Sequence, residues 1–477
     1  MVRADTLYLV LSVAVCVEAA AEAVKPGAIV RLTQKGLDYA RQEGISVLQQ
    51  QLSQIHLPDF SGSYDVGFLG NVDYRFSGLV ISSVQLADSQ VSLIPSVGLK
   101  LTISGAFIQI DGNWDVRYTF IHEDGSLNLK LMGVSISAGL ILGSDTSGRP
   151  TISPADCSSH ISNVEVHMSG TIGWLVDLFH GTVESALRQT MESQICPAVT
   201  ESINTKLDPL LKTLPVIANI DHTSAIDYSL TGPPSVLTGW VDVQLKGEFF
   251  DVSHRTAPPF SAPEMPLPPE QGLMVYFGVS EYLFNTAAYV YQLAGALVFN
   301  LTDDMIPKDS IIRLNTSFLG TLIPQVLKMY PDMLVKLKMS SPSVQALKIK
   351  PDNLTMWPVV DVQAFAILPN SSLASLFLIQ LTTNATAKVA LDSGRIIGNL
   401  DLGRVETKLV HSDVGPFSVS LLNEIANYCV SRILLPRLNV ILKKGLPLPL
   451  IDHVEITDSV LQTYEHYLLF GANVRYV

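Results

Sequence analysis

The stretch "AIVRLTQKGLDYARQEGISVLQQQL" (residues 28–52) joins an apolar strand pattern to a helical one. Apolar or small residues recur three or four positions apart in the second part, as on one face of a helix; they are Leu37, Ala40, Gly44, Leu48, Leu52 and Ile55. A glycine inside a helix costs about 1 kcal/mol relative to alanine. Ala40 and Gly44 therefore predict a shallow stripe, which favours an occupant other than a packed side chain.

The same strand-then-helix pattern returns in "LMVYFGVSEYLFNTAAYVYQLAG" (273–295). Each copy is followed by short alternating strand patterns and by a second long helix, at 172–199 and 417–442. Both late helices meet a proline at a like place, Pro197 and Pro436. We predict a two-fold repeat of one α+β unit, each with a strongly curved antiparallel sheet or barrel and two long helices.

The helix at 172–199 has apolar residues at steps of four: Phe179, Val183, Leu187, Met191 and Ile195. This stripe favours a helix that packs on the sheet of its own unit.

A proline-rich segment separates the two copies. Residues 255–272, "RTAPPFSAPEMPLPPEQG", hold six prolines, a density that no helix or central strand tolerates. We predict a first unit at 24–250, a linker at 251–272 and a second unit at 273–477.

The N-terminus has the features of a secretory signal peptide. Arg3 precedes the apolar run 7–17, and Ala21-Glu22-Ala23 fits a small-x-small cleavage site, so we predict a signal at 1–23. The alternative, an anchor helix, is disfavoured because the run is about half the ~20 residues that a span needs. The chain is 47% hydrophobic and 16% charged, and no other uninterrupted apolar run reaches spanning length. We expect a secreted, extracellular protein whose apolar residues lie inside.

Charge excludes one class of partner. The whole chain carries −13, and the predicted signal contains one basic and three acidic residues, so the mature chain would carry −11. This is not the charge of a nucleic-acid binder.

Three cysteines remain after the signal, which is an odd number for a secreted chain. One disulfide and one leftover thiol is the simplest arrangement. Cys429 lies in an apolar helical pattern, so a buried thiol in a monomer is favoured over a disulfide-linked dimer through Cys429. Five N-glycosylation sequons occur, all in the second half: Asn300, Asn315, Asn353, Asn370 and Asn384.

A second informative stretch is "QIDGNWDVRYTFIHEDGSLNL" (109–129). Its Asp111-Gly112 and Asp124-Gly125 pairs predict two tight hairpins in succession. Trp114, Tyr118 and Phe120 fall on one face, where they would either enter a membrane interface or, for Trp114, pack on the neighbouring strand.

The sequence offers no recognisable catalytic or metal-binding motif. It contains no HExxH, CxxC, GxSxG, Walker or GxGxxG arrangement. We therefore expect no enzyme activity, no metal and no cofactor.

Several longer motifs are similar to those of one family. They are "RLTQKGLDYA" (31–40), "PSVGLKLTISGA" (95–106), "CSSHIS" (157–162), "GWLVDLFH" (173–180), "LKGEFF" (245–250), "DDMIPKDS" (303–310) and "VDVQAFAILPNSSLASLFLI" (360–379). On these motifs the chain resembles the secreted lipid-transfer and lipopolysaccharide-binding family over nearly its whole mature length.

The resemblance implies a boomerang-shaped molecule in which a central sheet joins two barrels, each with an apolar pocket for a phospholipid. The pocket of the first unit would include Leu37, Ala40, Gly44, Leu48, Phe179, Val183 and Leu187. The resemblance also implies a disulfide between Cys157 and Cys196.

The endotoxin-killing members of this family have a basic tip on the first barrel. The matching segments here are 63–76 and the 109–129 stretch, which offer Arg75, Asn113, Trp114, Arg117 and Tyr118. Residues 25–230 nevertheless hold 12 basic and 20 acidic residues.

Two functions follow from the resemblance. The first is an innate-immune protein that binds lipopolysaccharide of the bacterial outer membrane through lipid A, secreted or stored in granules. The second is a phospholipid carrier without a strong preference for endotoxin.

Overall fold

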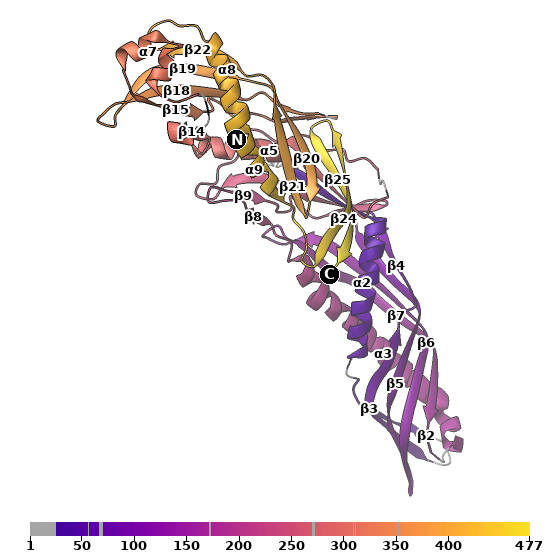
Figure 1. Cartoon of the computed structure of the whole chain (residues 1–477). Helices are drawn as coiled ribbons and strands as arrows, with labels where there is room; N and C mark the ends of the chain where they lie inside the picture. Colours follow the sequence, from indigo (N-terminus) through magenta and orange to yellow (C-terminus); the bar gives the residue numbers. More distant parts are fainter. Residues whose placement is uncertain are drawn as a thin grey trace, which may run out of the picture.

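The computed structural model describes residues 25–55, 57–65, 70–170, 173–269, 272–308, 310, 312–351 and 353–477. The predicted signal at 1–23 lies outside these residues. The molecule is long and gently bent, with one α+β unit at each end and a sheet between them (Figure 1). The α+β fold and its two units are thereby confirmed.

One long, curled sheet forms the first unit. Its strands are β2 (Phe60–Asp65), β3 (Asn71–Gln85), β4 (Asp88–Ile94), β5 (Gly98–Tyr118), β6 (Ile121–Ser144) and β7 (Pro150–Met168). They are antiparallel in the order β2-β3-β5-β6-β7, and β4 also pairs with β5. Register shifts near Ala106 and Ala138 interrupt the ladders, and such bulges bend a sheet.

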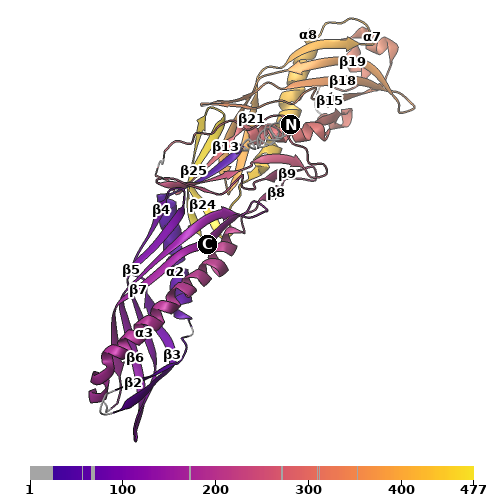
Figure 2. The same ribbon diagram turned by 180° about the vertical axis from the view of Figure 1, so that it is seen from behind.

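Two helices run along this sheet (Figures 1 and 2). They are α2 (Gln34–Ser53) and α3 (Gly173–Ser202), and α3 continues through a π-helical turn (Ile203–Leu207) into α4 (Asp208–Leu211). Thr33 caps α2 by accepting a hydrogen bond from the backbone N–H of Gly36. Pro197 lies inside α3 rather than at its end.

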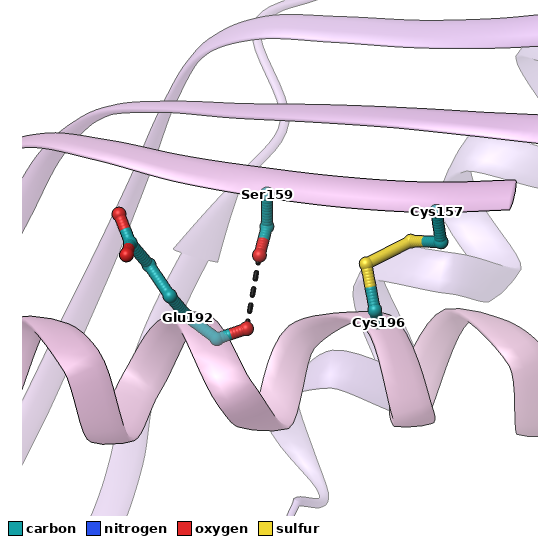
Figure 3. The surroundings of a disulfide bond; sticks show 4 residues. All are labelled: Cys157, Ser159, Glu192 and Cys196. Carbon is teal, nitrogen blue, oxygen red and sulfur yellow. Dashed lines mark hydrogen bonds between the residues drawn. A yellow bond between two sulfur atoms is a disulfide. The ribbon is translucent and has the colours of Figure 1, made fainter.

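A disulfide fastens α3 to β7. Cys157 and Cys196 are bonded, with their Cα atoms 5.8 Å apart (Figure 3). Close by, the Ser159 hydroxyl donates to the backbone carbonyl of Glu192 over 2.9 Å, and the Glu192 carboxylate accepts from the backbone N–H of Ile161. The helix is therefore held on the strand by a covalent bond and by two hydrogen bonds one turn away.

The central sheet contains strands from both repeats. Its order is β10 (Ser235–Val236), β11 (Trp240–Leu245), β1 (Ala28–Thr33), β13 (Val275–Ser280), β25 (Tyr467–Tyr476) and β24 (Val454–Tyr464). The two predicted opening strands, β1 and β13, pair directly with each other. A separate sheet of β8 (Ile217–Asn219), β9 (Ser224–Asp227) and β12 (Glu248–Asp251) lies beside it.

The proline-rich segment is extended but packed on the central sheet. Arg31 is almost fully buried, forms two hydrogen bonds to Asp242, and donates a third to the carbonyl of Pro268 over 2.6 Å. The Tyr467 hydroxyl donates to the carbonyl of Pro266. Met265 is buried in the same cluster. Residues 265–268 of the segment are thus held against the sheet.

The second unit divides its strands between two sheets. One holds β14 (Val298–Leu301), β15 (Leu334–Ser340), β18 (Val359–Ile367), β19 (Leu373–Thr382) and β22 (Glu406–Ser412). The other holds β16 (Lys348–Lys350), β17 (Asn353–Met356), β20 (Ala385–Asp392), β21 (Arg395–Leu402) and β23 (Leu446–Pro447). The helical segments are α5 (Glu281–Leu293), a 3₁₀ turn (Asp303–Met305), α6 (Thr316–Gly320), α7 (Pro324–Met329), α8 (Ser420–Cys429), a π-helical turn (Val430–Leu434) and α9 (Leu435–Lys444).

Candidate functional site

The middle of α2 is open, as its sequence predicts. Leu37 and Leu48 are buried in the core of the first unit, whereas Ala40 and Gly44 between them are exposed. A Cβ added to Gly44 would meet no atom within 4 Å. The glycine is therefore not required by a close neighbour, and the helix leaves space at this point.

The other predicted pocket residues lie on α3. Leu187 is buried in the same core as Leu37. Phe179 and Val183 belong to α3, but their side chains lie outside the described part of the structure. The assignment of these residues to a lipid pocket stays a prediction.

The stretch 109–129 forms one long hairpin, so the prediction of two hairpins was wrong. β5 and β6 pair continuously from Ile103↔Ile136 to Tyr118↔Ile121, with register shifts only near Ala106. The chain turns at Thr119 and Phe120, where Thr119 has φ 50°. Residues Asp111, Gly112, Asp124 and Gly125 lie within the strands and not in turns.

Packing explains the glycine that resembled a turn residue. A Cβ on Gly125 would lie 2.5 Å from the backbone oxygen of Ser169 and 2.8 Å from Nε1 of Trp114. The Trp114 indole N–H donates to that same oxygen of Ser169 over 3.0 Å. Gly125 therefore makes room for the indole ring, which is 1% exposed. Trp114 packs on the neighbouring strand, which is the second of its two predicted places, so its assignment to the ligand-contacting tip was wrong.

The two arginines predicted at the tip are both engaged by carboxylates. Arg75 lies 2.8 Å from Asp59, and Arg117 lies 3.3 Å from Asp115. Asp115 also lies 2.5 Å from Nε2 of His122. The hydrogen bond from His122, followed by the charge of Arg117, lowers the pKa of the Asp115 carboxyl. Because their partners are anionic, these cations offer little net positive charge to a ligand.

An aromatic side chain stands alone at the end of the hairpin. Phe120 is 95% exposed, Tyr118 is half-buried, and Asn113 is exposed farther along β5. An apolar ring at the end of a two-stranded arm suits insertion between lipid chains better than recognition of phosphate.

The second unit has a hollow that sequence patterns did not indicate. It has a volume of about 560 Å³ and lies between β20 and β24; its lining residues are Leu354, Ala387, Lys388, Val389, Leu461, Gln462, Thr463 and Tyr464. This volume falls within the range of small-molecule sites. No sequence signal pointed to it because its walls come from strands far apart in the chain.

The predicted modification sites lie in ordinary surroundings. Four of the sequon asparagines are exposed, whereas Asn315 is half-buried and caps α6 by accepting a hydrogen bond from the N–H of Phe318. Occupancy of the sequons stays a prediction.

Cys429 is unbonded and buried, and burial raises the pKa of its thiol to about 11.

The described residues contain no group of three or more His, Cys, Asp or Glu side chains that could hold a metal ion.

Comparisons with known families match both units. Residues 36–210 match the model of the LBP / BPI / CETP family, N-terminal domain, and residues 218–476 match that of the C-terminal domain.

Individual relatives align over nearly the whole chain. Lipopolysaccharide-binding protein of Bos taurus is 42% identical over 452 residues, which cover 95% of this chain and 94% of the relative. Bactericidal permeability-increasing protein of Rattus norvegicus is 41% identical over 453 residues, with the same two coverages. A crystal structure of lipopolysaccharide binding protein aligns with TM-score 0.69 and 39% identity, covering 95% of this chain and 100% of that one.

Proposed function

This chain belongs to the LBP / BPI / CETP family, and from that premise we propose that it is a secreted innate-immune protein that binds lipopolysaccharide through lipid A. The observation that carries the proposal is the extent of the match. Two relatives named for lipopolysaccharide binding or bactericidal action each share about 40% of their residues with both units of this chain. The proposed protein acts by binding and not by catalysis.

We place the first contact with the bacterial outer membrane at the tip of the first unit. Phe120 enters the acyl region, while Arg75, Asn113, Arg117 and Tyr118 lie farther back along the strands. Full burial of a phenylalanine side chain contributes about 1.5–3 kcal/mol. This apolar contact compensates for the absence of net positive charge at the tip, where acidic residues outnumber basic ones.

Phospholipid or lipid A chains then occupy an apolar pocket in each unit. In the first unit the open stripe at Ala40 and Gly44 supports this step. Burial of acyl chains is worth about 0.8 kcal/mol per CH₂ before ordering costs, whereas one cation near an anionic surface is worth about 1 kcal/mol. A pair of chains therefore outweighs the loss of several cations from the tip.

A specific observation favours the second candidate, a phospholipid carrier. The first unit holds more acidic than basic residues, and both tip arginines have carboxylate partners. A carrier of neutral or zwitterionic phospholipid needs no basic clamp.

Vesicle binding separates the two functions. The binding of the mature chain to lipid A vesicles and to phosphatidylcholine vesicles is measured, each at low and at physiological salt. Preference for lipid A at both salts supports the first function, whereas equal binding, together with salt-insensitive lipid transfer between vesicles, supports the carrier. Arg75→Gln with Arg117→Gln removes two cations and leaves the carboxylates of Asp59 and Asp115 without these partners, so it should weaken binding to lipid A vesicles and leave binding to phosphatidylcholine vesicles unchanged.

We further propose a monomer that keeps Cys429 as a buried thiol. The depth and raised pKa of this thiol support the monomer over a disulfide-linked dimer. Secretion with storage in granules is part of the same proposal, and the exposed sequon asparagines would carry glycans in the secretory pathway.

A further inference from the structure

Helix α9 has an unusual surface for a helix of a folded unit. It has no buried residue, although five of its ten residues are leucine, isoleucine or valine. Val440 and Ile441 are 62% and 61% exposed. Exposed apolar side chains on adjacent positions of one helix indicate a surface that is covered by something else in use.

The orientation of α9 is fixed by its contact with β21. The Asn439 side chain donates to the backbone carbonyl of Leu400 and accepts from its N–H over 2.7 Å, so this side of the helix packs on the strand. At 3.6 residues per turn, Arg437, Ile441 and Lys444 lie on the opposite side, with Val440 beside them. Figure 1 shows α9 in gold next to β21 on the outside of the second unit.

The outer side of α9 is also basic, in a chain with net charge −13. Arg437, Lys443 and Lys444 are exposed, and residues 425–444 contain no acidic residue. The nearest acidic residue in the sequence, Glu424, lies 2.5 Å from Arg404. The cations of α9 are therefore not neutralised by carboxylates of their own helix.

The helix has the composition of an interfacial segment. Among the described residues, Ser420–Lys444 is the one helical stretch long and apolar enough to cross a membrane by those two criteria. Its cations and its packing on β21 are not those of a membrane-spanning helix. They are typical of a helix that lies in the plane of a membrane surface.

We propose that the outer face of α9 docks on the surface of an anionic lipid bilayer. Val440 and Ile441 enter the boundary between headgroups and acyl chains, and Arg437 and Lys444 contact lipid phosphates. Lys443 lies about 40° from Asn439 around the helix, so its long side chain reaches the headgroups from the edge of the outer face. Charge complementarity selects this occupant, because a zwitterionic surface has no net charge to attract these three cations, of which Arg437 also lies over the ring of Phe299. The surface is on the second unit and does not depend on the tip of the first.

A triple neutralisation tests the electrostatic part. Arg437→Gln, Lys443→Gln and Lys444→Gln are combined in the full mature chain, and circular dichroism checks that the fold is kept. Each cation contributes about 1 kcal/mol at an anionic surface and about 1.4 kcal/mol is tenfold, so we expect roughly hundredfold weaker partitioning onto phosphatidylglycerol vesicles. Partitioning onto phosphatidylcholine vesicles should not change.

A matched control has the same total charge. Lys328→Gln, Lys350→Gln and Lys408→Gln remove three exposed lysines of the same unit, from α7, β16 and β22. We expect this variant to bind phosphatidylglycerol vesicles within a few-fold of the original chain. Equal losses in the two triple variants would overturn the proposal, because only the net charge would then matter.

A local probe tests the apolar part. Ile441→Cys is labelled with an environment-sensitive fluorophore, while the buried Cys429 stays unlabelled. We expect the emission to shift to the blue on phosphatidylglycerol vesicles and to stay unchanged on phosphatidylcholine vesicles. An unchanged emission on bound phosphatidylglycerol vesicles would overturn insertion of this face, whatever the protein does with lipid A.

Discussion

Replacement of Gly125 by alanine should destabilise the first unit, although alanine is normally the better residue in a strand. The new Cβ would lie 2.5 Å from the backbone oxygen of Ser169 and 2.8 Å from Nε1 of Trp114. Both are atoms of one hydrogen bond, and Trp114 is fully enclosed. Neither can move away without displacing a strand end or a buried indole ring.

The magnitude follows from three contributions. Overpacking of a filled site costs about 1–3 kcal/mol, and loss of the indole hydrogen bond costs about 0.5–1.5 kcal/mol. The lower backbone entropy of alanine in the unfolded chain returns about 0.5–1 kcal/mol. We therefore expect a net loss of about 0.5–4 kcal/mol in the free energy of unfolding, with a middle value of about 2 kcal/mol.

Urea unfolding followed by circular dichroism measures the total effect, and amide hydrogen exchange of the 109–129 peptide localises it. Gly44→Ala is the matched control: its Cβ meets no atom within 4 Å, so helix propensity should stabilise the protein by up to about 1 kcal/mol. An unchanged or higher stability of Gly125→Ala would refute the assignment of Gly125 to close packing.

Phe120→Ser should weaken vesicle binding by roughly tenfold to a hundredfold without a change in thermal stability, because the ring is exposed; unchanged binding would remove this ring from the membrane contact. Loss of the disulfide through Cys157→Ser and Cys196→Ser should cost about 4 kcal/mol in the chain-entropy estimate for its loop, read as a lower thermal midpoint; an unchanged midpoint would contradict it. The Asp115 carboxyl has a lowered pKa, so its contribution is present above the unfolded value of 3.8 and is lost as the pH falls below it. The stability gap between the original chain and Asp115→Asn should therefore shrink between about pH 5 and about pH 3, and a constant gap would count against the ion pair. Cys429 should resist alkylation at about pH 8 until the protein unfolds, because burial raises the pKa of its thiol to about 11; rapid labelling of the native chain would show an accessible thiol.

The repeat was predictable because its evidence is local. The strand at 28–33 and the helix after it keep their own apolar periods, as do β13 and α5. The open stripe on α2 was predictable for the same reason, since a glycine in a helix is informative without knowledge of its neighbours.

The hairpin was mispredicted because a glycine in a sequence can mark either a tight turn or a place where a neighbouring side chain needs space. An Asp-Gly pair favours a tight turn, but Gly125 is needed for the ring of Trp114, which lies across the strand pair at Trp114↔Gly125. Only the register of the two strands reveals that requirement. The actual turn, Thr119-Phe120, carries no glycine and gave no signal.

Contacts between segments that lie far apart in the chain could also not be predicted from one sequence alone. The contact of β1 with β13 and the hollow between β20 and β24 join residues that share no local pattern. The charge and exposure of α9 likewise emerge only when the packed side of the helix is known.

The central sheet has a consequence for biosynthesis. Strand β1 is made long before its partners β11 and β13, which follow at residues 240–245 and 275–280, and β25, the other partner of β13, follows only at residues 467–476. The sheet of the first unit can form during translation as soon as its strands have been made, since they are neighbours in sequence, whereas the central sheet is complete only after β24 and β25 have been made. A premature stop codon before β24 would leave one edge of β13 without a partner. Such a truncated chain would keep the first unit and most of the second, and it would still be bound by chaperones and degraded.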